Sequence, residues 1–180
     1  MAQRKPVRSE CPPHPELEEL KRKWGASRIH RRTVRYPDLD VSRDYEPCKG
    51  EGVSIVVGSG KRVLLARRYS PEILSGPRDW TLPSGRIRPN ETVEEGTARE
   101  IWEETGLEAN LVKLVRVEWV NTEFKTWINE RMHFVFLAEP IGGELGTRDR
   151  DEIRDLKWFS LESVPPHIQQ LRLWASMKDA

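Results

Sequence analysis

The segment from Gly85 to Leu107 constrains this chain more than any other, because the spacing of its charged residues is typical of a helix with one acidic face. Glu100, Glu103 and Glu104 stand at positions i, i+3 and i+4, so a helix places their carboxylates within an arc of about 100°. Three like charges this close destabilise a helix unless something positive lies among them. Hard divalent cations bind carboxylate oxygens, and Mg²⁺ also keeps waters and substrate phosphates in its coordination shell. The face therefore predicts a Mg²⁺ or Mn²⁺ site for a phosphate-bearing substrate.

Two more charged residues belong to the same pattern. Arg99 provides the nearest positive charge, and Glu91 precedes it at a spacing that places it on roughly the same side of the helix. We expect a Glu91–Arg99 ion pair to tie the entrance of the helix to its acidic face. A solvated surface is the plainer interpretation of three glutamates taken alone, but the pattern around them is complete. Its fixed positions are Gly85, Glu91, Arg99, Glu100, Ile101, Glu103, Glu104, Gly106 and Leu107.

This pattern resembles the Nudix box, the signature of the Nudix hydrolases. Looser similarity extends over roughly residues 50–177, with a strand hairpin and a Trp-any-Leu-Pro sequence before the box and an acid ahead of a Trp-Phe strand after it. The resemblance implies an α/β fold, a Nudix-type α/β/α sandwich with a mixed β-sheet. It assigns residues 49–180 to the Nudix domain and leaves residues 1–48 as an N-terminal tail and extension. Ser84 departs from the family, which often has glycine there, and we expect only a small effect.

The resemblance implies the roles of individual residues. Glu100, Glu103 and Glu104 are similar to the metal-binding carboxylates of the family, with Glu103 bridging two ions. The backbone carbonyl of Gly85 is a further possible ligand.

The remaining box residues correspond to structural or catalytic positions. Arg99 resembles the arginine that orients the acidic face, Glu91 resembles its partner, and Gly106 lies beyond the end of the helix. The family usually supplies one more glutamate from a loop after the box, and Glu152 is the best candidate, although it could also be an ordinary acid of a surface loop. The general base is left open among Glu100, Glu103 and Glu152.

The reaction that the resemblance implies is metal-assisted hydrolysis of a diphosphate linkage in a nucleotide. The box leaves the substrate open. No proline precedes Pro140 after the box and no tyrosine follows Tyr69, so the motifs of the ADP-ribose type and of one dinucleoside polyphosphate type are missing. The extended motif of the NADH type is also absent. This elimination favours a nucleoside triphosphate or a related nucleotide. ADP-ribose or a nucleotide sugar, an RNA 5′ end, and a binding module without turnover are the alternatives.

Residues outside the box could bind the substrate. Arg67, Arg68 and Arg78 flank the loop before the box and could hold phosphates, and Arg67 and Arg78 are retained as candidates. Base recognition needs an apolar slot with an aromatic face, for which Trp119, Phe124 and Trp127 are the candidates. The plainer interpretations are solvated arginines and aromatic residues that pack in the core or a hairpin. Trp80 and Trp102 are expected to belong to the core.

The secondary structure can be predicted from residues that begin or end helices and strands and from the periodicity of apolar residues. Residues 1–15 hold 4 of the 13 prolines and are expected to form a mobile tail, followed by a helix at Pro15–Trp24 and a weakly alternating strand at Arg28–Tyr36. Strands are expected at Gly52–Gly58, Arg62–Ala66, Trp80–Leu82, Leu111–Val120, Arg131–Ala138 and Leu156–Phe159, with a turn at Ser59-Gly60 and loops at Ser70–Pro77 and Ile141–Arg150. Helices are expected at Glu91–Thr105, with Asn90 as N-cap, and from Pro165/Pro166 to about Met177.

Composition and charge restrict the class of protein. The net charge is +1, which gives no global reason to expect a nucleic acid or an anionic membrane as main partner. The apolar runs are far too short to cross a bilayer, the N-terminus carries no apolar signal region, and the two cysteines form no zinc-site spacing. We expect a cytoplasmic enzyme with a small nucleotide substrate. The basic run Arg28–Arg35 could bind RNA, although an exposed strand face is the simpler interpretation, and the N-terminal segment could pair across a homodimer.

Overall fold

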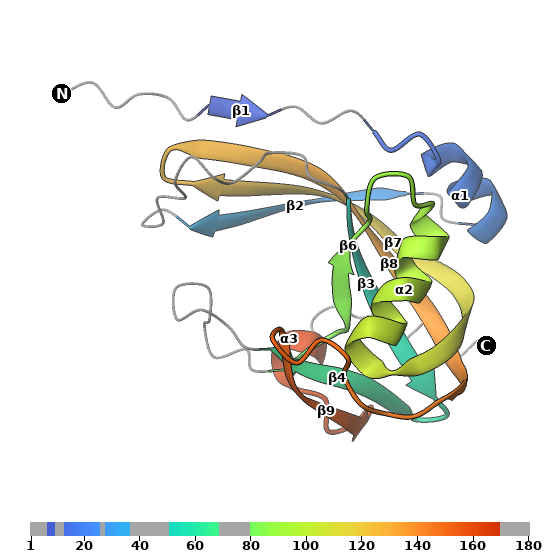
Figure 1. Cartoon of the computed structure of the whole chain (residues 1–180). Helices are drawn as coiled ribbons and strands as arrows, with labels where there is room; N and C mark the ends of the chain where they lie inside the picture. Colours follow the sequence, from blue (N-terminus) through green and yellow to red (C-terminus); the bar gives the residue numbers. More distant parts are fainter. Residues whose placement is uncertain (1–6, 10–12, 26–27, 37–50, 69–79, 170–180) are drawn as a thin grey trace.

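The computed structural model describes residues 7–9, 13–25, 28–36, 51–68 and 80–169. Three helices and nine strands lie within these ranges (Figure 1). They are β1 (Val7–Ser9), α1 (Leu17–Trp24), β2 (Ile29–Tyr36), β3 (Gly52–Ser59), β4 (Arg62–Arg68), β5 (Trp80–Thr81), β6 (Ser84–Arg86), α2 (Val93–Thr105), β7 (Leu107–Phe124), β8 (Trp127–Gly143), β9 (Ile153–Ser160) and α3 (Pro166–Gln169). The fold is an α/β sandwich, as the resemblance implied.

The strands form one mixed sheet in the order β2-β7-β8-β3-β4-β5. The pairs β2–β7 and β3–β8 are parallel, whereas β7–β8 and β3–β4 are antiparallel. Three further strands pair outside this path, β1 with β8, β6 with β3, and β9 with β4. Because β6 pairs with β3 at the centre of the sheet, the segment that begins the Nudix-like pattern is fixed against the core.

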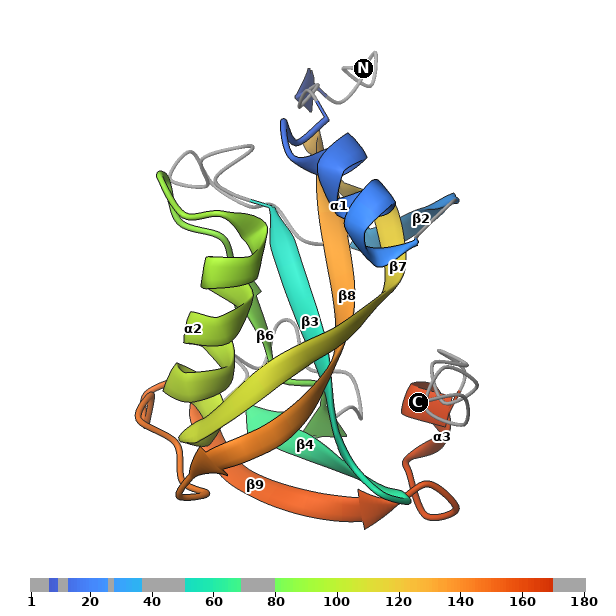
Figure 2. The ribbon, with the colours of Figure 1, turned by 90° about the vertical axis from the view of Figure 1, so that its right-hand side faces the viewer.

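The two faces of the sheet bury different apolar clusters. Leu17 and Leu20 of α1 and Ile101 of α2 pack on one face, together with Ile55 and Phe134 of the central strands. The opposite face carries a cluster in which Val56, Leu137 and Ile168 of α3 take part. Side chains alternate along a strand, so neighbouring residues of β3 and β8 supply the two clusters. Figure 2 shows α2 and α3 on opposite sides of β3 and β8, which is the layered arrangement of a sandwich.

The helix α2 is held at both ends by local chemistry. Its N-cap is Thr92, whose hydroxyl accepts a hydrogen bond from the backbone N–H of Glu95, while the Glu95 carboxylate accepts one from the N–H of Thr92. The expectation that Asn90 caps the helix is wrong, because this capping box satisfies two backbone donors at once and Asn90 instead adopts a positive φ of 70° in the preceding turn. Gly106 ends the helix at a φ of 71°.

Most predicted elements are present with different limits. The predicted strands at 111–120 and 131–138 belong to a much longer hairpin, β7 and β8, whose pairing is interrupted by three register shifts. Residues 7–9 form a strand instead of belonging wholly to a tail, because they pair in parallel with the outer end of β8. Trp102 is 45% exposed and stacks under the Arg148 guanidinium, so its assignment to the core is wrong. The loop predicted at Ser70–Pro77 and the end of the last helix lie outside the described residues.

The N-terminal elements pack on the same sheet as the rest of the chain. β2 pairs with β7 over its whole length, and α1 contributes to the first apolar cluster. The division of the chain after residue 48 stays a prediction. No helix in the described part of the chain is both long and apolar enough to span a membrane.

Candidate metal and phosphate site

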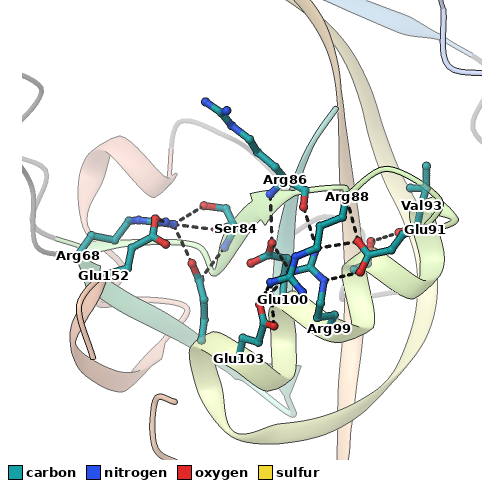
Figure 3. Close-up of polar contacts among 12 residues, drawn as sticks. Arg68, Ser84, Arg86, Arg88, Glu91, Val93, Arg99, Glu100, Glu103 and Glu152 are labelled. Carbon is teal, nitrogen blue, oxygen red and sulfur yellow. Dashed lines mark hydrogen bonds and ion pairs between the residues drawn. The ribbon is translucent and has the colours of Figure 1, made fainter. Parts of the chain in front are cut away.

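The acidic face of α2, formed by Glu100, Glu103 and Glu104, lies against β6 (Figure 3). The backbone N–H of Arg86 donates to Glu100 Oε1 at 3.2 Å, and the N–H of Ser84 donates to Glu104 Oε2 at 2.8 Å. A Cβ built on Gly85, between these two donors, would overlap the carboxyl group of Glu100. A side chain at this position would therefore displace the Glu100 carboxyl group from β6.

Arg99 is the centre of the ion-pair network on this face. Its guanidinium donates twice to Glu91, at 2.6 and 2.8 Å, once each to Glu100 and Glu103, at 2.8 and 2.9 Å, and once to the carbonyl of Arg86, at 2.8 Å. These five bonds match the five N–H donors of a guanidinium. Hydrogen bonds from Arg99 lower the pKa of Glu91 to about 2, and the bond to Glu91 raises the pKa of Arg99. The predicted Glu91–Arg99 pair thus positions the guanidinium that holds Glu100 and Glu103.

Glu104 is the most buried carboxylate of the three, with 1% of its surface exposed. Burial raises the pKa of Glu104 to about 7, although the charge of Arg68 and the hydrogen bond from Ser84 act in the opposite direction. Arg68 Nη1 lies 3.0 Å from Glu104 Oε1, yet that oxygen has no hydrogen bond of acceptable geometry within the described residues. The pair is an ion pair without an aligned donor, so this oxygen keeps an unused acceptor site.

Arg68 also connects this face to a second loop. Its Nη1 donates to the carbonyl and hydroxyl oxygens of Ser84 at 2.8 and 2.9 Å, and its Nη2 forms an ion pair with Glu152. Glu152 therefore lies next to the acidic face, although the whole hairpin of β7 and β8 separates it from Glu104 in the sequence. A further arginine, Arg88, donates to both carboxylate oxygens of Glu103 at 3.0 and 3.1 Å.

The donor chemistry of this face suits a hard divalent cation. It offers three carboxylates and the backbone of Gly85 within one short segment, and Glu104 Oε1 is a buried acceptor without a hydrogen bond. Within the described ranges no three Asp, Glu, His or Cys side chains converge on a point that could hold a metal ion. Each carboxylate is paired with an arginine instead. The residues present fit the cation chemically, and the arginines occupy the same oxygens.

Comparison with known proteins decides the family. The family model of the NUDIX domain matches residues 49–179, and this range contains every contact of the acidic face described above. The chain belongs to the Nudix family.

Curated relatives and solved structures agree with this assignment. The chain is 42% identical over 92 residues, half of its length, to the mouse protein named 8-oxo-dGDP phosphatase NUDT18, and covers 26% of that protein. It is 30% identical over 137 residues, 76% of its length, to the NAD-capped RNA hydrolase NudC of Pseudomonas aeruginosa, and covers 45% of that protein. The chain thus spans less than half the length of these two relatives. A crystal structure of a MutT NUDIX hydrolase from Burkholderia pseudomallei matches 69% of this chain and 95% of its own, at 26% identity and a TM-score of 0.54.

The predicted substrate-binding residues that the structure describes lie on β4 and β7. Trp119 packs at the edge of the first apolar cluster, and Phe124 stacks on Tyr36 with ring centroids 5.7 Å apart. Arg67 precedes Arg68 on β4, at the point where the pairing of β4 with β9 shifts register. Arg78 and the side chain of Trp127 lie outside the described part. A role of these residues in substrate binding stays a prediction.

Two arginines of the Nudix site were not singled out by the sequence patterns. In the sequence Arg68 cannot be told apart from its neighbour Arg67 as a phosphate ligand, and Arg88 matches no fixed position of the box. Arg88 lies between the fixed glycine and glutamate of the box, where the pattern accepts any residue.

Proposed function

We propose that this Nudix protein is a divalent-metal-dependent pyrophosphohydrolase that cleaves a nucleoside diphosphate linked to another group, most simply a nucleoside or deoxynucleoside triphosphate. The observation that carries the proposal is the acidic face of α2, seated on Gly85 and oriented by Arg99. A solvated surface would not need a buried glutamate, a glycine in contact and a fully bonded guanidinium.

The chain's own residues divide the work in this proposal. Glu100, Glu103, Glu104 and the carbonyl of Gly85 would hold Mg²⁺ or Mn²⁺, which when bound neutralises phosphate charge and lowers the pKa of a coordinated water. Arg99 holds the carboxylates of Glu100 and Glu103 close to β6, because the same guanidinium also donates to the Arg86 carbonyl. Arg68 and Arg88 neutralise the face when no cation is bound, and they become available as phosphate ligands when a cation takes the carboxylates.

The general base is one of three carboxylates. Glu100 is nearly buried and bonded to Arg99 and the Arg86 N–H, so its oxygens are the most restricted. Glu103 and Glu152 are more exposed and each is paired with an arginine at the surface. Proton removal from a water requires a carboxylate within hydrogen-bond reach, and all three glutamates remain candidates.

The names of the two relatives support a nucleotide substrate. One is named for a modified deoxynucleoside diphosphate and the other for an RNA with a dinucleotide cap. An RNA 5′ end is therefore the second candidate, and the exposed basic strand β2 is the structural feature that favours it. ADP-ribose, nucleotide sugars and a binding module without turnover complete the set to be tested.

A substrate panel separates these possibilities. Purified protein would be incubated with Mg²⁺ and nucleoside di- and triphosphates, ADP-ribose, nucleotide sugars, dinucleoside polyphosphates and 5′-triphosphorylated and NAD-capped RNA. Metal-dependent release of a nucleoside monophosphate or of phosphate from any of them supports the proposal, and steep salt dependence on RNA would favour the RNA end. Saturable nucleotide binding without turnover of any compound would establish the binding module instead.

A further inference from the structure

The C-terminal end of α2 is covered by residues 144–152, which join β8 to β9 and which we call the β8–β9 connection (Figure 2). The backbone N–H of Gly146 donates to the Thr105 carbonyl at 2.9 Å. The N–H groups of Arg148 and Asp149 both donate to the Glu103 carbonyl, at 2.9 and 3.2 Å. Carbonyls in the last turn of a helix have no partner within the helix, so the connection supplies donors that α2 needs.

Arg148 adds a side-chain contact to these backbone bonds. Its guanidinium lies 4.5 Å from the centroid of the Trp102 ring, on the exposed side of α2. A guanidinium over an indole face is attracted by the ring quadrupole. The last turn of α2 contains no basic residue, so Arg148 also brings a positive charge to the negative end of the helix dipole. Trp102 stands where the Nudix pattern accepts any residue, so the pattern assigns it no role.

The β8–β9 connection holds Glu152 through Asp149. Asp149 Oδ1 accepts a hydrogen bond from the N–H of Glu152 at 3.1 Å, and the Asp149 carbonyl accepts one from the N–H of Ile153 at 2.9 Å. Glu152 is therefore one hydrogen bond away from the residue that binds the Glu103 carbonyl. Its side chain continues toward Arg68, with which it forms an ion pair. The place of Glu152 thus depends on how the connection lies on the helix end.

Glu103 belongs to both arrangements. Its carboxylate is part of the acidic face and pairs with Arg88 and Arg99, while its carbonyl binds the connection. A shift of the connection along α2 would move Glu152 relative to the Glu103 carboxylate. Displacement of a reacting group by about 1 Å can cost up to about 10²-fold in rate. The contact that keeps the connection on the helix end is therefore a candidate for control of the reaction.

We propose that Trp102 and Arg148 are positioning residues, whose contact holds the β8–β9 connection on α2 and thereby places Glu152 for the reaction. Trp102 acts through Arg148, and Glu152 is the group that takes part in the chemistry. This inference rests on the proposed function of the acidic face. The competing explanation is that Trp102 acts on Glu103, its neighbour in the helix, without involving Glu152.

A double-mutant cycle separates the two explanations. We would measure kcat and KM with Mg²⁺ on the best substrate for the wild type, Trp102→Ala, Glu152→Gln and the double variant. Trp102→Ala should lower kcat about tenfold and change KM by less than about threefold, because Glu152 loses its place and substrate contacts remain. Glu152→Gln should lower kcat by about 10²-fold. In the Glu152→Gln background, Trp102→Ala should lower kcat by less than about twofold, because its effect passes through Glu152.

Conservative and control variants identify the contact itself. Trp102→Phe keeps an aromatic face under Arg148 and should retain kcat within about threefold of the wild type. Arg148→Ala should reproduce the loss seen in Trp102→Ala. Arg150→Ala removes the same charge from the same connection and should leave kcat and KM unchanged. Equal losses in Trp102→Phe and Trp102→Ala would contradict the aromatic contact.

Amide hydrogen exchange tests the holding of the connection without reference to turnover. Exchange of residues 144–152, followed by mass spectrometry, should be at least about tenfold faster in Trp102→Ala and Arg148→Ala than in the wild type. Arg150→Ala should exchange at the wild-type rate. Arg148 lies on the exposed connection and not in the core, so its variant keeps the test open if Trp102→Ala fails to fold.

Three outcomes would overturn the inference. They are wild-type exchange rates in both Trp102→Ala and Arg148→Ala, a wild-type kcat in Glu152→Gln, and a full effect of Trp102→Ala in the Glu152→Gln background. If the wild type hydrolyses no substrate, the proposed function fails and takes the role of Glu152 with it. The exchange rates then decide separately whether Trp102 and Arg148 hold the connection on α2.

Discussion

Arginine and glutamate side chains form the centre of both the acidic face of α2 and a cavity on the opposite face of the sheet, yet they are arranged in opposite proportions. We call the second site the β2 cavity, and its polar lining includes Arg32, Arg116, Glu118 and His133. Around the acidic face three arginines, Arg68, Arg88 and Arg99, pair with five carboxylates, those of Glu91, Glu100, Glu103, Glu104 and Glu152. In the cavity two guanidinium groups hold one carboxylate, Glu118. Excess carboxylate favours a cation, whereas excess guanidinium favours carbonyl or phosphate oxygens. The same pair of residue types thus forms two sites of opposite charge balance in one sheet.

Removal of one charge from the acidic face should have the largest effect on activity. Glu103→Gln keeps the shape of the side chain, and we expect kcat to fall by at least about 10²-fold because one electrostatic stabiliser of the reaction is lost. Steady-state kinetics with Mg²⁺ on the best substrate measures it. Glu94→Gln is the control, since Glu94 lies on the same helix but pairs with Lys23 and Trp24. A rate near wild type for Glu103→Gln would show that Glu103 holds no catalytic ion.

Replacement of the orienting arginine should have the next largest effect. Arg99→Lys keeps the positive charge but reduces five donors in a planar fork to three in a flexible ammonium group. We expect kcat to fall roughly tenfold, with a smaller change in KM, because Glu100 and Glu103 lose their fixed orientation. Measured kcat and KM at saturating Mg²⁺ test this. Unchanged kinetics would mean that charge alone, without geometry, organises the face.

The contact between β6 and α2 can be tested by adding one methyl group. Gly85→Ala inserts a Cβ into the carboxyl group of Glu100, and overpacking of this kind costs about 1–3 kcal/mol of unfolding free energy. Gly146→Ala is the matched control, because a Cβ there meets nothing within 4 Å. Urea unfolding of both variants gives the comparison. Equal stabilities of the two variants would contradict the close approach of β6 to the acidic face.

The smallest expected effect concerns pH and the cavity. His133 has a pKa of about 3 in the folded chain, whereas an unfolded histidine titrates near pH 6.5. Between these values the unfolded state binds more protons, so the unfolding free energy falls as the pH drops below about 6.5. His133→Gln should flatten this part of the profile in denaturant unfolding between pH 7.5 and pH 4.5. A profile as steep as that of the wild type would show that His133 is not the responsible group.

The two regions differ also in how far the sequence could predict them. The acidic face repeats with the period of a helix within 23 residues, so local spacing was sufficient to predict Glu91, Arg99 and the three glutamates as one group. The β2 cavity joins Arg32, Glu118 and His133, which meet only because β2 pairs with β7 and β7 with β8. Such pairing is set by tertiary register, which no local pattern contains.

Tertiary contacts also explain why individual residues differ from their predicted positions. Thr92 and Asn90 are both good capping residues, and the reciprocal bond with Glu95 decides between them. Trp102 follows an apolar position of the helix, but the side of α2 on which it lies faces Arg148 and solvent. Glu152 could be predicted only through family resemblance, and its contact with Arg68 depends on how β9 pairs with β4.

A titration with Mn²⁺ in the presence of a non-hydrolysable nucleoside triphosphate analogue addresses the acidic face most directly. Electron paramagnetic resonance or calorimetry would follow metal binding to the wild type and to a Glu100→Gln/Glu103→Gln double variant. We expect at least one Mn²⁺ to bind the wild type and affinity to fall by at least about tenfold in the double variant. Equal binding by both proteins, or none by either, would contradict a metal site on α2.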